Sequence, residues 1–123
     1  AIIQVGYLTK SEYEYTHHVR LGTEQFGVTE DDINAITLET NGKKSCLSKL
    51  EKTILRSARD MVTNLKITDI DFDFLKVSLS NEHLVDLVLT IAFYCAVVRV
   101  LATLEIDNEP HYKEALEKFP LPN

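Results

Sequence analysis

Signals that start an α-helix recur along the whole 123-residue chain. At such a start, a short polar side chain accepts a hydrogen bond from an amide of the first helical turn. Five residues stand at predicted starts: Ser11, Thr29, Ser48, Thr68 and Ser80. No stretch alternates between apolar and polar residues for as long as a strand requires. The sequence therefore predicts an all-α protein.

Apolar residues between these starts follow helical spacing. One predicted buried face begins at Leu47, next to Ser48. It comprises Leu47, Leu50, Ile54, Ala58, Met61 and Leu65. After Thr68, the residues expected to be buried are Ile70, Phe74, Leu75 and Leu79. Residues 2–8 form a first helix in which Gly6 is a weak point, and residues 41–44 form the clearest loop.

The helix that follows Ser80 is unusually apolar. Residues 87–98 include no charged side chain, and they are apolar on all sides of the helix. An apolar run of this length is typical of a buried helix and is too short to cross a membrane. Because one small domain covers only part of such a helix, we expect its other side to contact a second subunit. The sequence therefore predicts a homo-oligomer.

Composition limits the class of protein. A chain of this length forms one domain, residues 1–123, with a core of modest size. The net charge is −6, and lysines and arginines are scattered, which excludes a nucleic-acid surface. The first residues lack the pattern of a signal peptide. We expect a cytoplasmic protein that binds neither membrane nor nucleic acid.

A candidate site lies in the second predicted helix. Glu14 and His18 are four residues apart and share one face, and Ser11 lies one turn before Glu14. A carboxylate beside an imidazole is suited to proton transfer, yet Ser11 and Glu14 also match a capping box. Two side chains are too few for a zinc site, so we expect no metal. His17 points about 100° away from His18, so we interpret it as exposed or in a subunit contact.

Other side chains leave two interpretations open. An unpaired guanidinium is costly to bury, so Arg99 should meet a carboxylate, carbonyl oxygens or a substrate anion. Four tyrosines either line a pocket or belong to the core: Tyr7, Tyr13, Tyr15 and Tyr94.

The two cysteines are far apart in the sequence, so we expect free thiols. Cys95, in the apolar run, is interpreted as a packing residue. Arg99 lies four residues further on, and its positive charge would favour the thiolate form of Cys95.

Two stretches carry a resemblance to a known family. The first is Ser11-x-x-Glu14-x-x-x-His18, followed by Gly27-Val28-Thr29-Glu30. The second begins at Leu47-Ser48-x-x-Glu51 and includes Phe93-Tyr94 and Arg99. Together they make residues 2–106 similar to the carboxymuconolactone decarboxylase family, which includes alkylhydroperoxidase D. In its peroxidase branch the first motif is Cys-x-x-Cys-x-x-x-His, so only His18 matches by identity.

The resemblance implies an antiparallel helical domain of the alkylhydroperoxidase D-like type that assembles as a trimer or larger homo-oligomer. It also implies helices before Ala1 that we expect this chain to lack. The implied catalytic residues are Glu14, His18 and Ser11, and the implied substrate-binding residues are Arg99, Tyr94 and Tyr15.

Three functions follow as hypotheses. The first is a lyase that needs no cofactor and performs acid/base chemistry on a small carboxylate or lactone. The second is a peroxidase-like oxidoreductase, which the missing thiol pair at Ser11 and Glu14 argues against. The third is a non-catalytic, oligomeric module that binds a small ligand.

Overall fold

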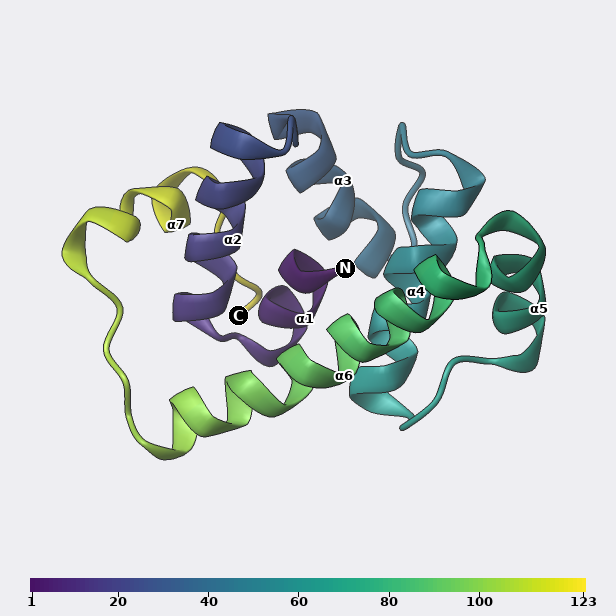
Figure 1. Ribbon diagram of the computed structural model, residues 1–123. Coiled ribbons are helices and arrows are strands. Elements are labelled where there is room, and N and C mark those ends of the chain that lie inside the picture. Colours follow the sequence, from purple (N-terminus) through teal and green to yellow (C-terminus); the bar gives the residue numbers. More distant parts are fainter.

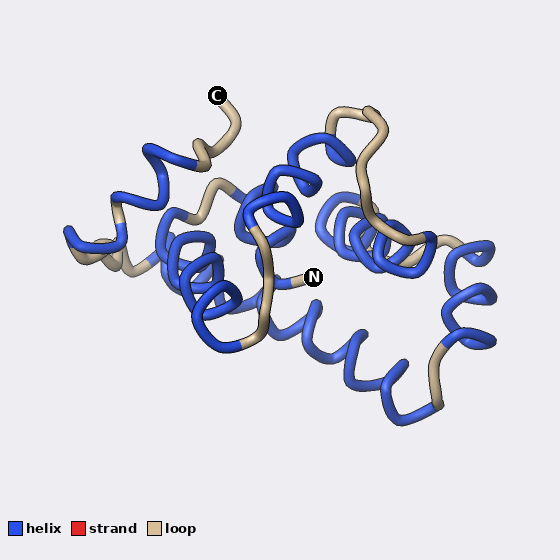
Figure 2. Tube along the Cα trace, turned by 90° about the horizontal axis from the view of Figure 1, so that it is seen from above, coloured by secondary structure: helices blue, strands red, loops and turns tan.

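The computed structural model describes residues 1–123 and contains helices but no strand (Figures 1 and 2). The elements are α1 (Ile2–Thr9), α2 (Glu12–Gln25), α3 (Glu30–Thr40), α4 (Lys49–Thr63), α5 (Asp69–Ser78), α6 (Asn81–Thr103), a 3-10 turn η1 (Pro110–Tyr112) and α7 (Glu114–Lys118). The prediction of an all-α protein is confirmed.

Four of the five predicted helix starts are capped by a side chain. Thr29 and Ser48 form complete capping boxes with Asp32 and Glu51. The hydroxyl groups of Thr68 and Ser80 accept hydrogen bonds from the third amides of α5 and α6. These bonds fix where α3, α4, α5 and α6 begin.

The capping box predicted at Ser11 is wrong. Ser11 precedes α2, but its side chain makes no capping bond. Its ψ of 96° differs from the 159° of Ser80, so its hydroxyl group is not directed at the first turn. The Ser11 amide already donates to the carbonyl of Gly6 at 3.0 Å, so the Glu14 carboxylate is not needed there.

The short helix α1 occupies the centre of the molecule and contacts α2, α4 and α6 (Figure 1). The close approach of α2 depends on Gly6. A Cβ atom at this position would lie 2.9 Å from the backbone nitrogen of Tyr15. Gly6 is therefore a packing requirement, in addition to the weak point of α1 that its low helix propensity predicts.

Three apolar clusters hold the helices together. The first joins the helices α1, α2, α3 and α4 to the C-terminal segment. It comprises Tyr7, Tyr15, Val19, Ile33, Ile36, Leu55 and Phe119. The second joins α1, α4 and α6 through Val5, Ala58, Ile91 and Val98. The third lies where α5 meets α4 and α6, and comprises Ile67, Leu75 and Leu84.

Two residues predicted to be buried are exposed. Leu65 is 89% exposed because α4 ends at Thr63, so the helical spacing no longer applies. Leu65 also has a φ of 76°, which directs the chain into the following turn. Ile70 is 83% exposed because α5 buries Leu75 instead.

Helix α6 crosses α1 and α4 and leaves much of its apolar surface uncovered (Figure 1). By length and composition alone, this helix is long and apolar enough to cross a membrane. The prediction that it is too short was based on the uncharged run of residues 87–98, which is shorter than the helix. The same test is passed by core helices of other proteins. The prediction that one side lacks a partner within the chain is confirmed, since Leu89 and Phe93 are more than half exposed.

Candidate functional site

A side-chain contact between α2 and α6 brings together three polar groups, those of Glu14, His18 and Tyr94. Nε2 of His18 lies 3.2 Å from the hydroxyl oxygen of Tyr94, and the two rings meet edge to face. Nδ1 of His18 lies 3.0 Å from Oε2 of Glu14. The predicted common face of Glu14 and His18 is confirmed, and α6 adds a hydroxyl group to it.

The contacts of His18 define how its ring can share a proton. Nδ1 lies 3.0 Å from the backbone carbonyl oxygen of Glu14 as well as from its carboxylate. Because both neighbours accept hydrogen bonds, we assign the proton of the neutral ring to Nδ1. Nε2 then accepts a hydrogen bond from the hydroxyl group of Tyr94. This is the arrangement of a base whose far nitrogen is oriented by an acidic group.

The carboxylate of Glu14 is held in an unfavourable place for a charge. The residue is only 6% exposed. Its buried Oε2 has no hydrogen bond of good geometry, although Nδ1 of His18 is close by. A buried carboxylate is stabilised when a positive charge appears beside it. Protonation of His18 would supply that charge.

The hydroxyl group of Tyr94 stays protonated over a wide pH range. Burial raises the pKa of Tyr94 above its ordinary value, and the nearby Glu14 carboxylate raises it further. Tyr94 therefore serves as a hydrogen-bond donor in neutral solution.

His18 and Tyr94 both line a cavity of about 410 Å³. Thr90, one turn before Tyr94 on α6, is a further polar residue of its wall. The rest of the wall is mainly apolar and comes from α1, α2 and the segment after α2: Ala1, Ile2, Ile3, Leu21, Gly22, Phe26 and Val28. A mostly apolar cavity with a few convergent polar groups is typical of a small-molecule site.

The other predicted site residues lie elsewhere. Ser11 lines a separate groove with residues of the last turns of α6. Tyr15 is 1% exposed and packs against Tyr7 in the core, at 5.9 Å between ring centroids. Of the four tyrosines, Tyr94 is the one that the cavity shares with His18.

Arg99 is exposed and donates a hydrogen bond to the carbonyl oxygen of Cys95, on its own helix. The expected carbonyl partner is thus present. The assumption that Arg99 is buried is wrong, because α6 turns this side away from α1 and α4.

His17 has a structural environment. Its ring stacks between Tyr13 and Tyr112, at centroid distances of 4.0 and 3.6 Å. Nε2 of His17 lies 3.3 Å from the carboxylate of Glu109. The predicted divergence from His18 is confirmed. The expectation that His17 is solvent-exposed is wrong, because its side chain is only 20% exposed, and the alternative of a subunit contact stays a prediction. His17 holds the C-terminal segment against α2.

Both cysteines are free, as predicted. Cys46 is exposed, and Cys95 is half-buried against the α1–α4–α6 cluster. Burial raises the pKa of the Cys95 thiol, and the smaller opposing effect of Arg99 does not reverse this. No three His, Cys, Asp or Glu side chains gather in a group able to hold a metal ion.

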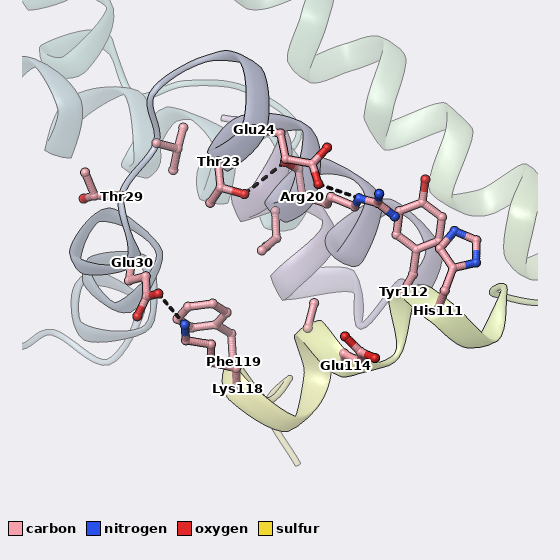
Figure 3. Close-up of a pocket in the computed structure, with 13 residues that line it drawn as sticks. Arg20, Thr23, Glu24, Thr29, Glu30, His111, Tyr112, Glu114, Lys118 and Phe119 are labelled. Atoms are coloured by element: carbon pink, nitrogen blue, oxygen red, sulfur yellow. Dashed lines mark hydrogen bonds and ion pairs between the residues drawn. The ribbon is translucent and has the colours of Figure 1, made fainter.

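A second cavity, of about 650 Å³, lies between α2, the start of α3 and the segment η1–α7 (Figure 3). Four of its charged groups are paired, Arg20 with Glu24 and Lys118 with Glu30, whereas Glu114 forms no ion pair. Arg20 also lies over the ring of Tyr112. Because both of its positive groups are already neutralised by carboxylates, this cavity is a weaker candidate than the one at His18.

Sequence reasoning missed Thr90 and the apolar wall of the cavity. Thr90 and Tyr94 are four residues apart on α6, so helical spacing was the available signal.

Comparisons of the chain with family models, curated proteins and solved structures find no significant match.

Proposed function

We propose that this chain is a carboxymuconolactone decarboxylase-like lyase that performs acid/base chemistry without a cofactor. The substrate would be a small, largely apolar carboxylate or lactone. The observation that supports this most is the close approach of three polar groups: the Glu14 carboxylate lies 3.0 Å from Nδ1 of His18, and Nε2 of His18 lies 3.2 Å from the hydroxyl oxygen of Tyr94, at the wall of an apolar cavity.

In this proposal, His18 accepts a proton from the substrate, either directly at Nε2 or through the hydroxyl group of Tyr94. Glu14 stabilises the imidazolium that forms, since its carboxylate lies 3.0 Å from Nδ1. When that proton comes from the carboxyl group of the substrate, the carbon–carbon bond to this group then breaks and carbon dioxide leaves. Return of the proton from His18 to the carbon that keeps the electron pair completes the cycle.

Recognition of the substrate would depend on shape and on hydroxyl groups. The cavity includes no arginine, so Arg99 is not the residue that would bind an anionic group there. The hydroxyl group of Thr90 would donate to a carboxylate or lactone carbonyl, and that of Tyr94 would do so once Nε2 of His18 carries a proton. The apolar wall would favour a substrate with few other polar groups.

A second candidate function is a non-catalytic module that binds the same class of ligand. The size and apolar wall of the cavity support binding without requiring catalysis. A peroxidase is supported less, because the raised pKa of Cys95 disfavours the thiolate that peroxide reduction requires.

The test combines binding and turnover. A panel of small carboxylates and lactones is screened by thermal shift, and each ligand that binds is followed by NMR for a chemical change. We expect turnover in the wild type, and a loss of about 10²-fold or more in His18→Ala and Tyr94→Phe. His83→Ala, an exposed histidine in the first turn of α6, is the control.

Turnover that survives His18→Ala would contradict the proposal. Binding without turnover, weakened by Tyr94→Phe, would establish the ligand-binding module instead.

A further inference from the structure

One side of α6 is an exposed apolar surface, which we name the α6 face. Its apolar residues are Val85, Leu89, Ala92, Phe93, Ala96 and Val100. The four larger side chains are between 54% and 62% exposed. Exposed apolar surface that is this continuous along one helix marks a site of association.

The α6 face has the spacing of a helix-pairing seam. Exposed residues along its middle lie at positions 82, 85, 89, 92, 96, 99 and 103, which alternate between steps of three and four. This period of 3.5 residues keeps a straight seam directed at a second helix. Helix α6 is already paired on its opposite side, where Ile91 and Val98 are buried against α1 and α4.

The charged residues of the α6 face are separated by sign. Glu82 and Asp86 lie near its N-terminal end, and Arg99 lies near its C-terminal end. None of the three belongs to an ion pair within the chain. Arg99 donates instead to the carbonyl oxygen of Cys95.

We propose that the α6 face binds the α6 face of a second copy of this chain, in an antiparallel pair related by a two-fold axis. An antiparallel pair places Arg99 of each copy near the acidic end of the other copy, at both ends of the contact. A parallel pair would place like charges together, which is destabilising. Antiparallel packing also opposes the two helix dipoles favourably.

One register satisfies the side chains as well as the charges. When Glu82 opposes Arg99 of the second copy, Val85 opposes Ala96 and Leu89 opposes Ala92. Val85 and Leu89 therefore each meet an alanine, which allows close packing along the middle of the contact. Because the pairs are reciprocal, the contact is closed and self-complementary, as a two-fold interface requires.

A membrane is the alternative partner for such a helix. Crossing a bilayer would separate α6 from α1 and α4 and would remove Ile91, which is fully buried, from the core. A second copy covers the exposed side and leaves that core intact.

The first test measures mass by sedimentation equilibrium. We expect the wild type to be a dimer or an even multiple of it. Arg99→Glu, and separately Glu82→Arg with Asp86→Arg, should each raise the dissociation constant by about 10-fold or more. An equal mixture of the two variants should restore association, since opposite charges meet again. Lys76→Glu, an exposed charge reversal on α5, is the matched control.

The second test measures orientation by disulfide formation. Both partners carry Cys46→Ser and Cys95→Ser, and one then carries Val85→Cys while the other carries Ala96→Cys. On mild oxidation, the mixture should form a covalent dimer, whereas neither variant should cross-link to itself. A parallel pair would give the reverse pattern. Circular dichroism confirms that each variant keeps the helical content of the wild type.

Several results would overturn the proposal. These are a monomeric or trimeric wild type, an oligomer indifferent to both charge reversals, and self-cross-linking at position 85. Cosedimentation of the wild type with phosphatidylcholine vesicles, with no dimer in solution, would assign the α6 face to a membrane.

Discussion

Nε2 of His18 lies 3.2 Å from the hydroxyl oxygen of Tyr94, although 76 positions of sequence separate the two residues. On the other side of the ring, Nδ1 faces the backbone carbonyl oxygen of Glu14 and Oε2 of its carboxylate. The imidazole is therefore held from two directions, and its orientation depends on the crossing of α2 and α6. Substitutions that separate orientation from charge follow from this geometry.

Glu14→Gln should separate stability from activity. The amide keeps the size of the side chain and removes a buried charge that has no hydrogen bond of good geometry. We expect the free energy of unfolding to stay within about 1 kcal/mol of the wild type, or to increase. Turnover should fall by about 10²-fold, because the imidazolium loses its carboxylate. Urea unfolding and the NMR turnover assay measure the two effects. Equal loss of stability and activity would show that Glu14 is only structural.

His17→Ala should lower stability and leave turnover unchanged, whereas His18→Ala should lower turnover. Removal of the His17 ring loses two stacking contacts, each worth roughly 0.5–1.5 kcal/mol. We expect lower stability and faster hydrogen exchange in residues 107–123, with turnover unchanged. His18→Ala should lose turnover by about 10²-fold and leave that exchange as in the wild type. If the two variants behave alike, His18 has no special role in proton transfer.

Stability should fall in alkaline solution through Tyr15. Burial, with a smaller contribution from Tyr7, raises the pKa of Tyr15 to about 12. In the unfolded chain Tyr15 ionises near pH 10, so its contribution is complete below that pH and is lost as the pH rises towards 12. We expect a loss of roughly 1–3 kcal/mol across that window. Denaturant unfolding at pH 9.5 and 11.5 should show a smaller decrease for Tyr15→Phe than for the wild type. Equal decreases would contradict this.

Gly6→Ala should destabilise the contact between α1 and α2. The new Cβ atom would meet the backbone of Tyr15, which cannot rotate away as a side chain can. We expect a cost of about 1–3 kcal/mol, measured by urea unfolding. Gly42→Ala is a useful comparison, because nothing lies within 4 Å of its added Cβ and its cost should come from its φ of 68° alone.

Reduction of hydroperoxides by the wild type should be negligible. In the family that we propose, Ser11 and Glu14 would stand at the thiol positions of the peroxidase motif, and burial raises the pKa of Cys95. A thiol-coupled peroxide assay should give the same low rate for the wild type and for Cys95→Ser. A high rate that is lost in Cys95→Ser would make Cys95 the nucleophile.

The helix starts were predictable from local chemistry, whereas contacts between helices were not. Thr29 and Ser48 cap helices as their sequences indicate, because each capping box involves only one turn. Ser11 fails because the preceding helix uses its amide, and that depends on the corner between α1 and α2. Leu65 fails because helical spacing does not reveal where α4 ends.

The candidate site was predictable only in part. Glu14 and His18 share a face because they are one turn apart, and this is a property of any helix. Tyr94 joins them through the crossing of α2 and α6, which no periodicity encodes. Arg99 was expected to be buried because its neighbours are apolar, yet it lies with Val100 on the exposed side of α6, whereas its neighbour Val98 is buried on the opposite side.

The central place of α1 has a consequence for synthesis. A ribosome releases α1 before α4 and α6, the two helices that cover it together with α2. Until residue 98 has emerged, Val5 has no Val98 to pack against, and the second cluster cannot close. The nascent chain therefore leaves one side of α1 exposed from the release of α1 until the release of α6, and an apolar side exposed in this way favours aggregation or the binding of chaperones.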